Sequence, residues 1–298
     1  MSKKMVIVGG AGFIGSNLSE ALVERGDEVH VIDTLVAGKN EFVPEGAELH
    51  KVDIRNYDDI APVIKGADTV FHLAALPRVQ FSIEHPRETN EVNVDGTVNI
   101  LTAAQKGGVR RVVYSASSSA YGDQETMPLV ETMPVMPLSP YGLQKYIGEE
   151  YCALFSEVYG LETVSLRYFN VYGKNQDPEG PYALVIGKFL KQKAEGGPLT
   201  ITGDGEQTRD FTSVNDVVQA NILASESEKV GKGEAINIGA GKNCSINKLA
   251  ELIGGEKEYI EERLEPKHTL ADISKAQQLL GWEPEVVLED GIEELLKM

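Results

Sequence analysis

The sequence contains few of the residues that mark disulfide-bonded, metal-clustered or membrane-spanning proteins. Its 298 residues include only two cysteines, Cys152 and Cys244, which have no metal-ligand spacing. A chain of this length needs no disulfide framework, so we predict a protein of a reducing compartment, with no metal site. No apolar run is long enough to cross a bilayer, and no signal-like segment with a cleavage site follows "MSKKMVIVGG". These absences favour a cytoplasmic location without a membrane partner.

Basic residues are also scarce. Lys and Arg number 28 against 46 Asp and Glu, which gives a net charge of -18. A surface of that sign repels nucleic acid, so we expect no nucleic-acid partner. An anionic small molecule would need basic side chains gathered at its own site. The sequence has no repeat of fixed period, which argues against a solenoid.

What the first half of the chain does have is an alternation of strand-like and helix-like segments. Helical candidates such as residues 90–106 and 141–159 separate short runs rich in Val and Ile. This order is typical of an α/β fold, so we predict a Rossmann-type, doubly wound parallel sheet with helices on both faces. The expected strands are "KMVIVGG", "DEVHVID", "AELHKVDI", "DTVFHLAA", "RRVVYSAS", "ETVSLRYFNVYG" and "EAINIGAG".

The alternation becomes weaker after about residue 172. "GKNQDPEGPY" is a polar loop, and "LTITGDGEQTRDF" has the residues of a hairpin or turn around Asp204 and Gly205. We predict a nucleotide-binding part in residues 1–171, joined by about residues 210–235. Residues 172–298 would form mainly a smaller, partly interleaved α+β part that binds the substrate. Ligands of such folds lie in the crevice at the carboxyl ends of the strands.

A glycine-rich loop follows the first expected strand. In "VIVGGAGFIGSNL" the glycines at 9, 10, 12 and 15 fit both G-x-G-x-x-G and G-x-x-G-x-x-G. Alone, such a match indicates only a glycine-rich turn. Here a strand precedes it, a helix follows it, and Asp33 ends the second strand. We therefore predict a dinucleotide site in which Asp33 binds both ribose hydroxyls and repels a 2'-phosphate, which favours NAD over NADP.

Asp53 follows the third strand, and two interpretations of it remain open. Its carboxylate could receive the adenine amino group of the cofactor, with Ile54 beside it. It could equally cap a turn, as Asp often does at the end of a strand.

Tyr141 and Lys145 lie four residues apart in "PLSPYGLQKYIGEEY", so they share one face of an expected helix. A tyrosine has a pKa of about 10, and lowering it by about 3 units needs roughly 4 kcal/mol. A nearby ammonium and a bound nicotinamide cation could supply that energy. The alternative is an amphipathic helix that buries the tyrosine and solvates the lysine. The dinucleotide loop and the serines of "VVYSASSSAYG" favour a catalytic pair.

These segments together resemble the extended short-chain dehydrogenase/reductase superfamily, and within it the nucleotide-sugar epimerases. The resemblance covers essentially the whole chain and includes "GGAGFIG", "FHLAA", "NVDGTVNIL", "SASSSAYG", "SPYGLQK", "LRYFNVYG", "GDGEQTRDF" and "ADISKAQQLLGWEP". It implies an NAD-dependent isomerase. It also implies a homodimer formed by a four-helix interface, to which residues 90–106 and 141–159 would contribute.

The resemblance assigns roles to individual residues. The catalytic positions would be Ser117, Tyr141 and Lys145. The cofactor would contact Gly9, Gly12, Phe13, Ile14, Gly15, Asp33, Asp53, Ile54, Leu73, Ala74, Ala75, Tyr141, Lys145 and Tyr168. The sugar nucleotide would contact Ser117, Ser118, Tyr141, Asn170, Arg209, Arg263 and Thr269. Arg209 would grip the diphosphate; its alternative is a salt bridge with Asp210.

Two departures bear on the reaction and the substrate. Related dehydratases and decarboxylases carry an acid before "YG", where this chain has Ser119 and Ala120. Dehydration needs a general acid to expel a hydroxyl, so this difference favours 4-epimerisation. At the position where a tyrosine narrows the sugar pocket of similar epimerases, this chain has the smaller Thr269. Arg263 lies one residue nearer to this position than the family pattern expects, and Lys267 or His268 could replace it.

The resulting prediction is NAD-dependent 4-epimerisation of a UDP-hexose through a transient 4-keto sugar. The substrates would be UDP-glucose and UDP-galactose, and also their N-acetylated forms. A nucleotide-sugar 4,6-dehydratase, or another enzyme that modifies nucleotide sugars, is the alternative within the superfamily. An NAD-binding sensor without catalysis is the alternative of another class, although such a protein has no reason to retain the Tyr141–Lys145 pair beside a serine cluster.

Overall fold

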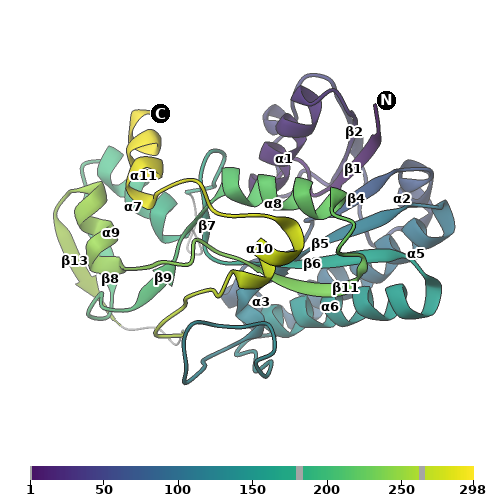
Figure 1. Cartoon of the computed structure of the whole chain (residues 1–298). Coiled ribbons are helices and arrows are strands. Elements are labelled where there is room, and N and C mark those ends of the chain that lie inside the picture. Colours follow the sequence, from purple (N-terminus) through teal and green to yellow (C-terminus); the bar gives the residue numbers. More distant parts are fainter. Residues whose placement is uncertain (1, 179–183, 262–265) are drawn as a thin grey trace.

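A seven-stranded parallel sheet forms the larger part of the molecule (Figure 1). The computed structural model describes residues 2–178, 184–261 and 266–298. The strand order is β11-β6-β5-β4-β1-β2-β3, and every neighbouring pair is parallel. Its strands are β1 (Lys4–Val8), β2 (Glu28–Asp33), β3 (Ala47–Lys51), β4 (Thr69–His72), β5 (Arg111–Ser117), β6 (Glu162–Tyr168) and β11 (Lys232–Ile238). The predicted fold class is confirmed.

Both faces of the sheet are buried, which explains why its strands are runs of Val and Ile. Met5 and Ile7 of β1 belong to one apolar core, whereas Val6 and Val8 belong to another on the opposite face. The first core includes apolar residues of α1 (Phe13–Glu24) and α8 (Val214–Glu226). The second includes residues of α2 (Tyr57–Ile64), α5 (Gly96–Gly107) and α6 (Pro140–Tyr159). The doubly wound arrangement follows from this division.

The helical prediction for residues 90–106 corresponds to a run of three segments. Helix α4 (Pro86–Asn90) continues into a π-helical segment, η2 (Glu91–Asp95), and then into α5. Helix α3 (Val79–Glu84) precedes them, and short 3-10 turns lie at η1 (Asn40–Phe42) and η3 (Ser118–Ala120). A π-helical turn inside a helix often marks a functional region, and this one lies beside α6.

A smaller part lies at the left of Figure 1 and has its own core, which includes Phe189, Ile201 and Leu249. Its elements are α7 (Val185–Ala194), β8 (Leu199–Thr202), β9 (Thr208–Asp210), β12 (Asn243–Ser245), α9 (Ile246–Ile253), β13 (Lys257–Ile260) and α11 (Leu288–Lys297). Strand β8 pairs with β13, and β9 pairs with β12. The segment at Asp204 and Gly205 is therefore a turn between strands of different pairs, not a hairpin.

The chain passes between the two parts repeatedly. It leaves the seven-stranded sheet after β6 and passes through β7 (Val171–Tyr172), which pairs in parallel with β10 (Thr212–Ser213). It returns through α8 to β11. Helix α10 (Ser274–Leu280) packs beside β11 and α8 on the second return. Segments of the two parts therefore alternate along the chain, as the sequence predicts. The boundaries given for the two domains stay a prediction.

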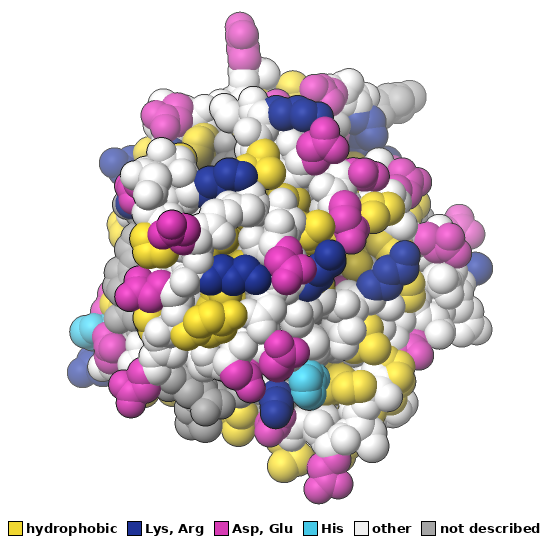
Figure 2. Space-filling model, turned by 90° about the vertical axis from the view of Figure 1, so that its left-hand side faces the viewer, with side chains coloured by type: hydrophobic (Ala, Val, Ile, Leu, Met, Phe, Trp, Pro, Cys, Tyr) yellow, Lys and Arg dark blue, Asp and Glu magenta, His cyan; other side chains and the backbone are white. Residues whose placement is uncertain are grey.

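Acidic and basic side chains are interspersed over the end of the molecule shown in Figure 2, with separate apolar groups between them. Within the described part of the chain, no helix combines the length and the apolar character that crossing a bilayer requires.

Candidate active site

The strand order predicts a ligand crevice at the carboxyl ends of β1 and β4. Successive connections run from β1 towards β2 and β3 on one side, whereas β4, β5 and β6 lie on the other side. The loops after neighbouring strands β1 and β4 thus diverge, which is where doubly wound sheets bind their ligands. The predicted residues after β1, β4, β5 and β6 all follow this edge.

The glycine loop is closely packed against the backbone around it. Gly9 has φ +85°, and a Cβ at this position would lie 2.6 Å from the amide nitrogen of Ala74. A Cβ at Gly15 would lie 2.1 Å from the carbonyl oxygen of Gly9. Any side chain at either position would displace the loop. Leu73, Ala74 and Ala75, predicted to flank the cofactor, follow β4 directly, and Ala74 lies against the glycine loop.

Helix α1 begins at Phe13, and its N-cap is Gly12, which has no side chain to cap the first amide groups. Such a helix start can present its N–H groups and its positive dipole end to a pyrophosphate. Asp33 is held at the end of β2 by the amides of Ala11, at 3.1 Å, and Leu35, at 2.8 Å. The tight glycine cradle, the open helix start and the fixed carboxylate fit the diphosphate and ribose of NAD.

Asp53 forms a turn and an ion pair. One carboxylate oxygen accepts the Arg55 backbone N–H at 2.9 Å, and the other accepts from the Arg55 guanidinium at 2.6 Å. These hydrogen bonds from Arg55 lower the pKa of the Asp53 carboxyl. The turn-capping interpretation is thus realised, and the contact with adenine stays a prediction. Ile54 is buried beneath Gly96, where an added Cβ would lie 2.5 Å from the Ile54 side chain.

Ser117 and Tyr141 come together from β5 and α6. Ser117 ends β5, and its hydroxyl accepts the backbone N–H of Ser119 at 3.2 Å and the hydroxyl of Ser119 at 2.8 Å. Burial raises the pKa of Tyr141 to about 12, while a hydrogen bond with Ser117 and the charge of Arg78 act in the lowering direction. Tyr141 is therefore a protonated phenol in this environment, with one predicted catalytic partner in contact.

Lys145 lies deeper than Tyr141. Its ammonium donates to the carbonyl of Ser115 at 2.7 Å and lies 5.0 Å from the ring centre of Tyr114. Burial lowers the pKa of Lys145 to about 8, with Cys152 and Glu149 opposing that change. The lysine therefore retains most of its positive charge near pH 7. Lys145 lies one helical turn after Tyr141, and its ammonium is bonded to β5 and not to Tyr141.

The start of α6 is fixed by Ser139 and Pro140 of the predicted helix start, and by Ser82 of α3. The Ser139 hydroxyl accepts the N–H of Gly142 at 3.1 Å, and Pro140 occupies the first helical turn. Ser82 of α3 accepts the backbone N–H of Tyr141 at 3.0 Å. This last contact holds the backbone of Tyr141 against α3, and no local pattern around Ser82 signals it.

Asn93 links α6 to the loop after β4. It accepts the N–H of Leu76 at 2.8 Å, and its amide donates to Leu76 at 3.2 Å and to Gln144 at 2.8 Å. Asn93 lies in the π-helical segment η2, and it is buried. Asn93 is the first residue of the "NVDGTVNIL" motif, but nothing local in the motif indicates its partners Leu76 and Gln144.

The predicted substrate residues meet on the other side of the crevice. Asn170, with φ 30°, follows β6 and donates from its side-chain amide to Thr269 at 3.3 Å. Arg209 of β9 is buried and donates to the carbonyls of Thr208, at 2.9 Å, and Lys267, at 3.3 Å. The structure thus gathers Asn170, Arg209 and Thr269 in one region. Arg263 lies outside the described residues.

Asp210 organises the same region through backbone amides. Its carboxylate accepts from Ala240 at 2.7 Å, Ala271 at 3.0 Å and Gly241 at 3.1 Å. Burial raises the pKa of Asp210 to about 6, although these amides act in the opposite direction. The side chain thereby ties β9 to the loop after β11 and to the segment that carries Thr269. These contacts give Asp210 a positioning role in place of the sequence alternative, a salt bridge with Arg209.

Tyr168 and Ser118 complete the predicted set. Tyr168 is opposite Ser117 in the register of β5 and β6, but its ring belongs to the core and its hydroxyl donates to Asn221 of α8 at 2.9 Å. Burial raises its pKa well above the ordinary value. Ser118 begins η3 directly after β5, beside Ser117. The contacts of both residues with ligands stay predictions.

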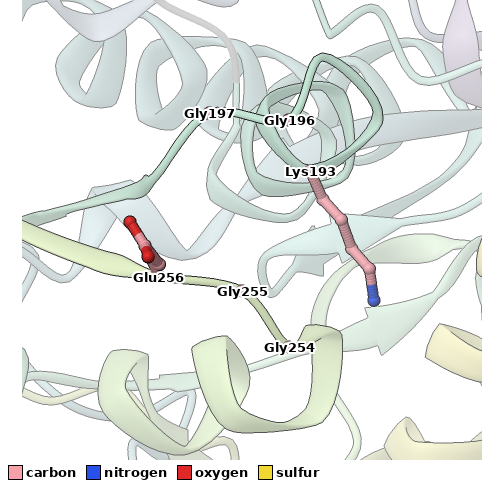
Figure 3. A pocket seen from close by; sticks show the side chains of 6 residues that line it. All are labelled: Lys193, Gly196, Gly197, Gly254, Gly255 and Glu256. Carbon is pink, nitrogen blue, oxygen red and sulfur yellow. The ribbon is translucent and has the colours of Figure 1, made fainter.

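A separate hollow lies in the smaller part, between the end of α7 and the turn from α9 to β13 (Figure 3). It is lined by Lys193, Gly196, Gly197, Gly254, Gly255 and Glu256. The ammonium of Lys193 donates to the carbonyl of Ile253. None of the predicted catalytic, cofactor or substrate residues is among the described residues that line the hollow. The hollow is not part of the candidate active site.

Comparison with known proteins identifies the family. Residues 5–239 match the model of the NAD dependent epimerase/dehydratase family, which is most of the chain. The chain belongs to this family. The expected cofactor, NAD, and the expectation of an enzyme of the nucleotide-sugar epimerase type are confirmed at this level.

Three similar proteins align with nearly the whole of this chain. It is 38% identical to a solved UDP-N-acetylglucosamine 4-epimerase of Methanobrevibacter ruminantium in complex with UDP-N-acetylmuramic acid, with a TM-score of 0.95 over 99% of this chain and 97% of that one. It is 36% identical to a UDP-glucose 4-epimerase of Thermotoga maritima solved with UDP-glucose, with a TM-score of 0.95 over 99% and 97%. A UDP-N-acetyl-alpha-D-glucosaminuronate decarboxylase of Bacillus cytotoxicus is 35% identical over 100% of this chain and 98% of that protein. Membership alone therefore leaves the reaction and the sugar open.

Proposed function

We propose that this protein interconverts UDP-hexoses by NAD-dependent epimerisation at carbon 4, with Tyr141 as the proton-transfer residue. The observation that carries the proposal is the packing of the start of α6, which carries Tyr141, against the end of β5 and η3, which carry Ser117 and Ser118, on the sheet edge that also carries the glycine cradle. The hydroxyl of Ser117 can orient the sugar hydroxyl towards the phenol. The proposed reaction class follows from the combination of Tyr141 as the proton acceptor and bound NAD as the hydride acceptor.

The pKa of Tyr141 sets the energetic requirement. Lowering it from about 12 to near 7 needs roughly 7 kcal/mol of preferential stabilisation of the phenolate. Arg78 already acts in that direction, and Ser117 can donate to the phenolate. The ammonium of Lys145 would contribute more by turning from Ser115 towards the crevice. We therefore infer that Tyr141 becomes a base only when the crevice is filled, which limits unproductive proton transfer.

When bound, NAD supplies reversible hydride acceptance at carbon 4 of the sugar. Tyr141 would take the 4-hydroxyl proton and hold it while the 4-keto sugar turns its other face to the cofactor. It would then return the proton to the 4-oxygen as the hydride returns to carbon 4, which forms the new hydroxyl. The nucleotide must stay fixed while the sugar turns, and Arg209 with Asn170 is the set that would hold the diphosphate.

The environment of the serine cluster supports epimerisation over dehydration or decarboxylation. Ala120 is fully buried and has no proton to donate, and the hydroxyl of Ser119 is bonded to Ser117. Expelling a hydroxyl from the sugar would need an acid at about this place. The small side chain of Thr269, bonded to Asn170, supports room for an N-acetyl group.

The proposed assembly is a homodimer. Helix α6 presents an apolar stripe that includes Leu143, Leu154 and Val158, which are 47%, 47% and 58% exposed. These side chains lie near one helix face at spacings of 11 and 4 residues, which suits packing against a second helix. Sedimentation of the wild type beside Val158→Glu tests this point. A wild type that sediments as a monomer would remove the dimer from the proposal.

Product analysis tests the function. The purified protein is incubated with UDP-glucose, UDP-galactose and their two N-acetylated forms, without added reductant, and the sugars are identified by NMR. We expect each pair to approach an equilibrium mixture of 4-epimers. A 4-keto-6-deoxy product would establish the dehydratase alternative instead. Bound NAD with no turnover on any sugar nucleotide would favour the sensor.

A further inference from the structure

Two histidines and a glutamate lie together on the sheet face at β2 and β3, away from the catalytic residues. His30 of β2 is opposite Glu48 of β3 in the strand register, and His50 lies two residues further along β3. Residues at these positions point to one face of a sheet. The two imidazoles are mostly covered but remain accessible to solvent, because the side chains of His30 and His50 are 13% and 22% exposed. The side chain of Glu48 is 67% exposed.

The three side chains present their ligand atoms to one another. The Nδ1 atom of His30 lies 3.0 Å from the Nε2 atom of His50. The Glu48 carboxylate places one oxygen 3.6 Å from the His30 nitrogen and the other 3.6 Å from the His50 nitrogen. Ligands at about 2.0–2.1 Å from a tetrahedral zinc ion are separated by about 3.3–3.4 Å. The observed spacings of 3.0–3.6 Å lie on both sides of that value.

We propose that His30, Glu48 and His50 form a three-ligand site for Zn²⁺ or a similar late first-row divalent cation, with its fourth position open to water. Two imidazoles and one carboxylate suit such ions better than Mg²⁺ or Ca²⁺, which take mainly oxygen ligands. Within the described residues, this is the group of His, Cys, Asp and Glu side chains whose ligand atoms converge closely enough to hold one ion.

Glu28 supplies the support that metal-bound histidines usually have. Its carboxylate lies 2.8 Å from the Nε2 atom of His30. A carboxylate only accepts hydrogen bonds, so the tautomer of His30 that fits Glu28 donates through Nε2 and leaves the lone pair of Nδ1 facing His50 and Glu48. With this tautomer and no metal bound, that lone pair can accept the Nε2–H of His50, 3.0 Å away. A cation would take the place of this shared hydrogen, after which His50 carries its proton on Nδ1.

The sequence conceals this site because its ligands are on two strands. Glu48 lies 18 positions after His30, and no short metal motif contains all three. The parallel register of β2 and β3 brings them together, and β3 is the edge strand of the sheet. A bound ion would therefore cross-link the edge strand to its neighbour. Lys4, on the next strand, is the nearby cation that opposes binding, and its ammonium donates to the carbonyl of Lys65 at 3.1 Å.

The proposal can be tested by treating the full-length protein with a chelator and then titrating it with zinc in a calorimeter, which measures the affinity and the number of sites. We expect one site per chain. His50→Asn should weaken zinc binding by at least about 100-fold, and Glu28→Gln by about 10- to 100-fold, the range typical of losing a supporting carboxylate. His85→Asn, which removes an exposed imidazole elsewhere, is the matched control and should leave the affinity unchanged. Co²⁺ should give the visible absorption of a four-coordinate ion in the wild type and not in His50→Asn.

Thermal unfolding gives a second readout that is independent of the sugar reaction. Zinc should raise the unfolding temperature of the wild type and of His85→Asn, but not of His50→Asn, because a ligand stabilises only the folded state that binds it. Circular dichroism establishes that each variant is folded. If His50→Asn and the wild type bind zinc with equal affinity and stoichiometry, the two histidines are only a hydrogen-bonded pair and the proposal is wrong.

Discussion

The two sides of the crevice are built by different means. On the cofactor side, the glycine loop permits backbone to lie against backbone, at Gly9 against Ala74 and at Gly15 against Gly9. The substrate side joins segments that are far apart in the chain, through hydrogen bonds from side chains such as Asn170 and Asp210. The first depends on the absence of side chains, and the second depends on the presence of particular ones.

This difference predicts how each side fails. An added methyl group in the glycine loop has no space and must move the backbone. A changed polar side chain on the substrate side leaves its neighbours in place but unpaired, which costs stability and alignment. Substitutions on the two sides should therefore affect different measurements, cofactor retention on one side and substrate selection or stability on the other.

The largest effect is expected where the two sides meet, at Tyr141. Tyr141→Phe removes the phenolic proton carrier and keeps the ring, so turnover of UDP-hexoses should fall by about 100- to 10,000-fold. NAD content should remain near that of the wild type, because the glycine loop is untouched. Tyr146→Phe, five residues along α6, is the control and should retain activity. Unchanged turnover in Tyr141→Phe would mean that another group transfers the proton.

The next effect tests the cofactor side. In Gly15→Ala the new Cβ meets the Gly9 carbonyl, which lies 2.1 Å away in the present backbone. Displacements of about 1 Å at a binding site can cost about 100-fold, and we expect NAD affinity to fall by about that factor. Gly197→Ala is the matched control, since its Cβ would come no nearer than 3.6 Å to Gln192. NAD affinity can be measured by calorimetry. Equal affinities in the two variants would show that the loop is not the cradle.

Asp210 tests the substrate side through its pH dependence. Its pKa of about 6 in the folded protein exceeds the ordinary 3.8 because the carboxyl is buried. The folded state therefore holds this proton more tightly, and the group stabilises the fold fully below about pH 3.8. That contribution, about 3 kcal/mol, is lost as the pH rises through about 6. The stability of the wild type relative to Asp210→Asn should accordingly decline between about pH 4 and 6, as measured by denaturant unfolding.

Asp68 provides a control of opposite sign. The guanidinium of Arg110 lowers its pKa from 3.8 to about 2. Its contribution is present above about pH 3.8 and is lost as the pH falls towards about 2. The stability of the wild type relative to Asp68→Asn should thus decline as the solution becomes more acidic. If the stability difference from wild type changed with pH in the same direction for Asp210→Asn and Asp68→Asn, the raised pKa of Asp210 would be wrong.

The smallest effect concerns the choice of sugar. Thr269→Tyr should lower kcat/KM for N-acetylated substrates by about tenfold more than for plain hexoses, because the ring occupies the space for the acetyl group. It also removes the hydroxyl that bonds Asn170 and Asp210. Thr269→Val removes the hydroxyl but keeps the size, and should affect both substrate types equally. Equal losses in Thr269→Tyr would contradict the size explanation.

The fold, and the helix that carries Tyr141 and Lys145, could be predicted because their signals are local. A strand, a glycine loop and a helix follow one another in residues 4–24, and Tyr141 and Lys145 are one turn apart. The support of Tyr141 by Ser82, and of the β4 loop by Asn93, depends on helices that meet only in the folded chain. The pattern around Asp210 indicates only its neighbour Arg209, whereas the amides that its carboxylate accepts belong to Ala240 and Ala271, 30 and 61 residues away.

The return of β11 to the sheet also has a consequence for biosynthesis. The ribosome completes the glycine loop and its β4 neighbour within the first quarter of the chain, but β6 must wait for β11 to form its outer pairing. About 70 residues separate the ends of these two strands, which at about 5–20 residues per second corresponds to roughly 4–14 s of synthesis. During that interval β6 is an exposed edge, so a nascent chain stalled in the smaller part should be the species most prone to bind chaperones.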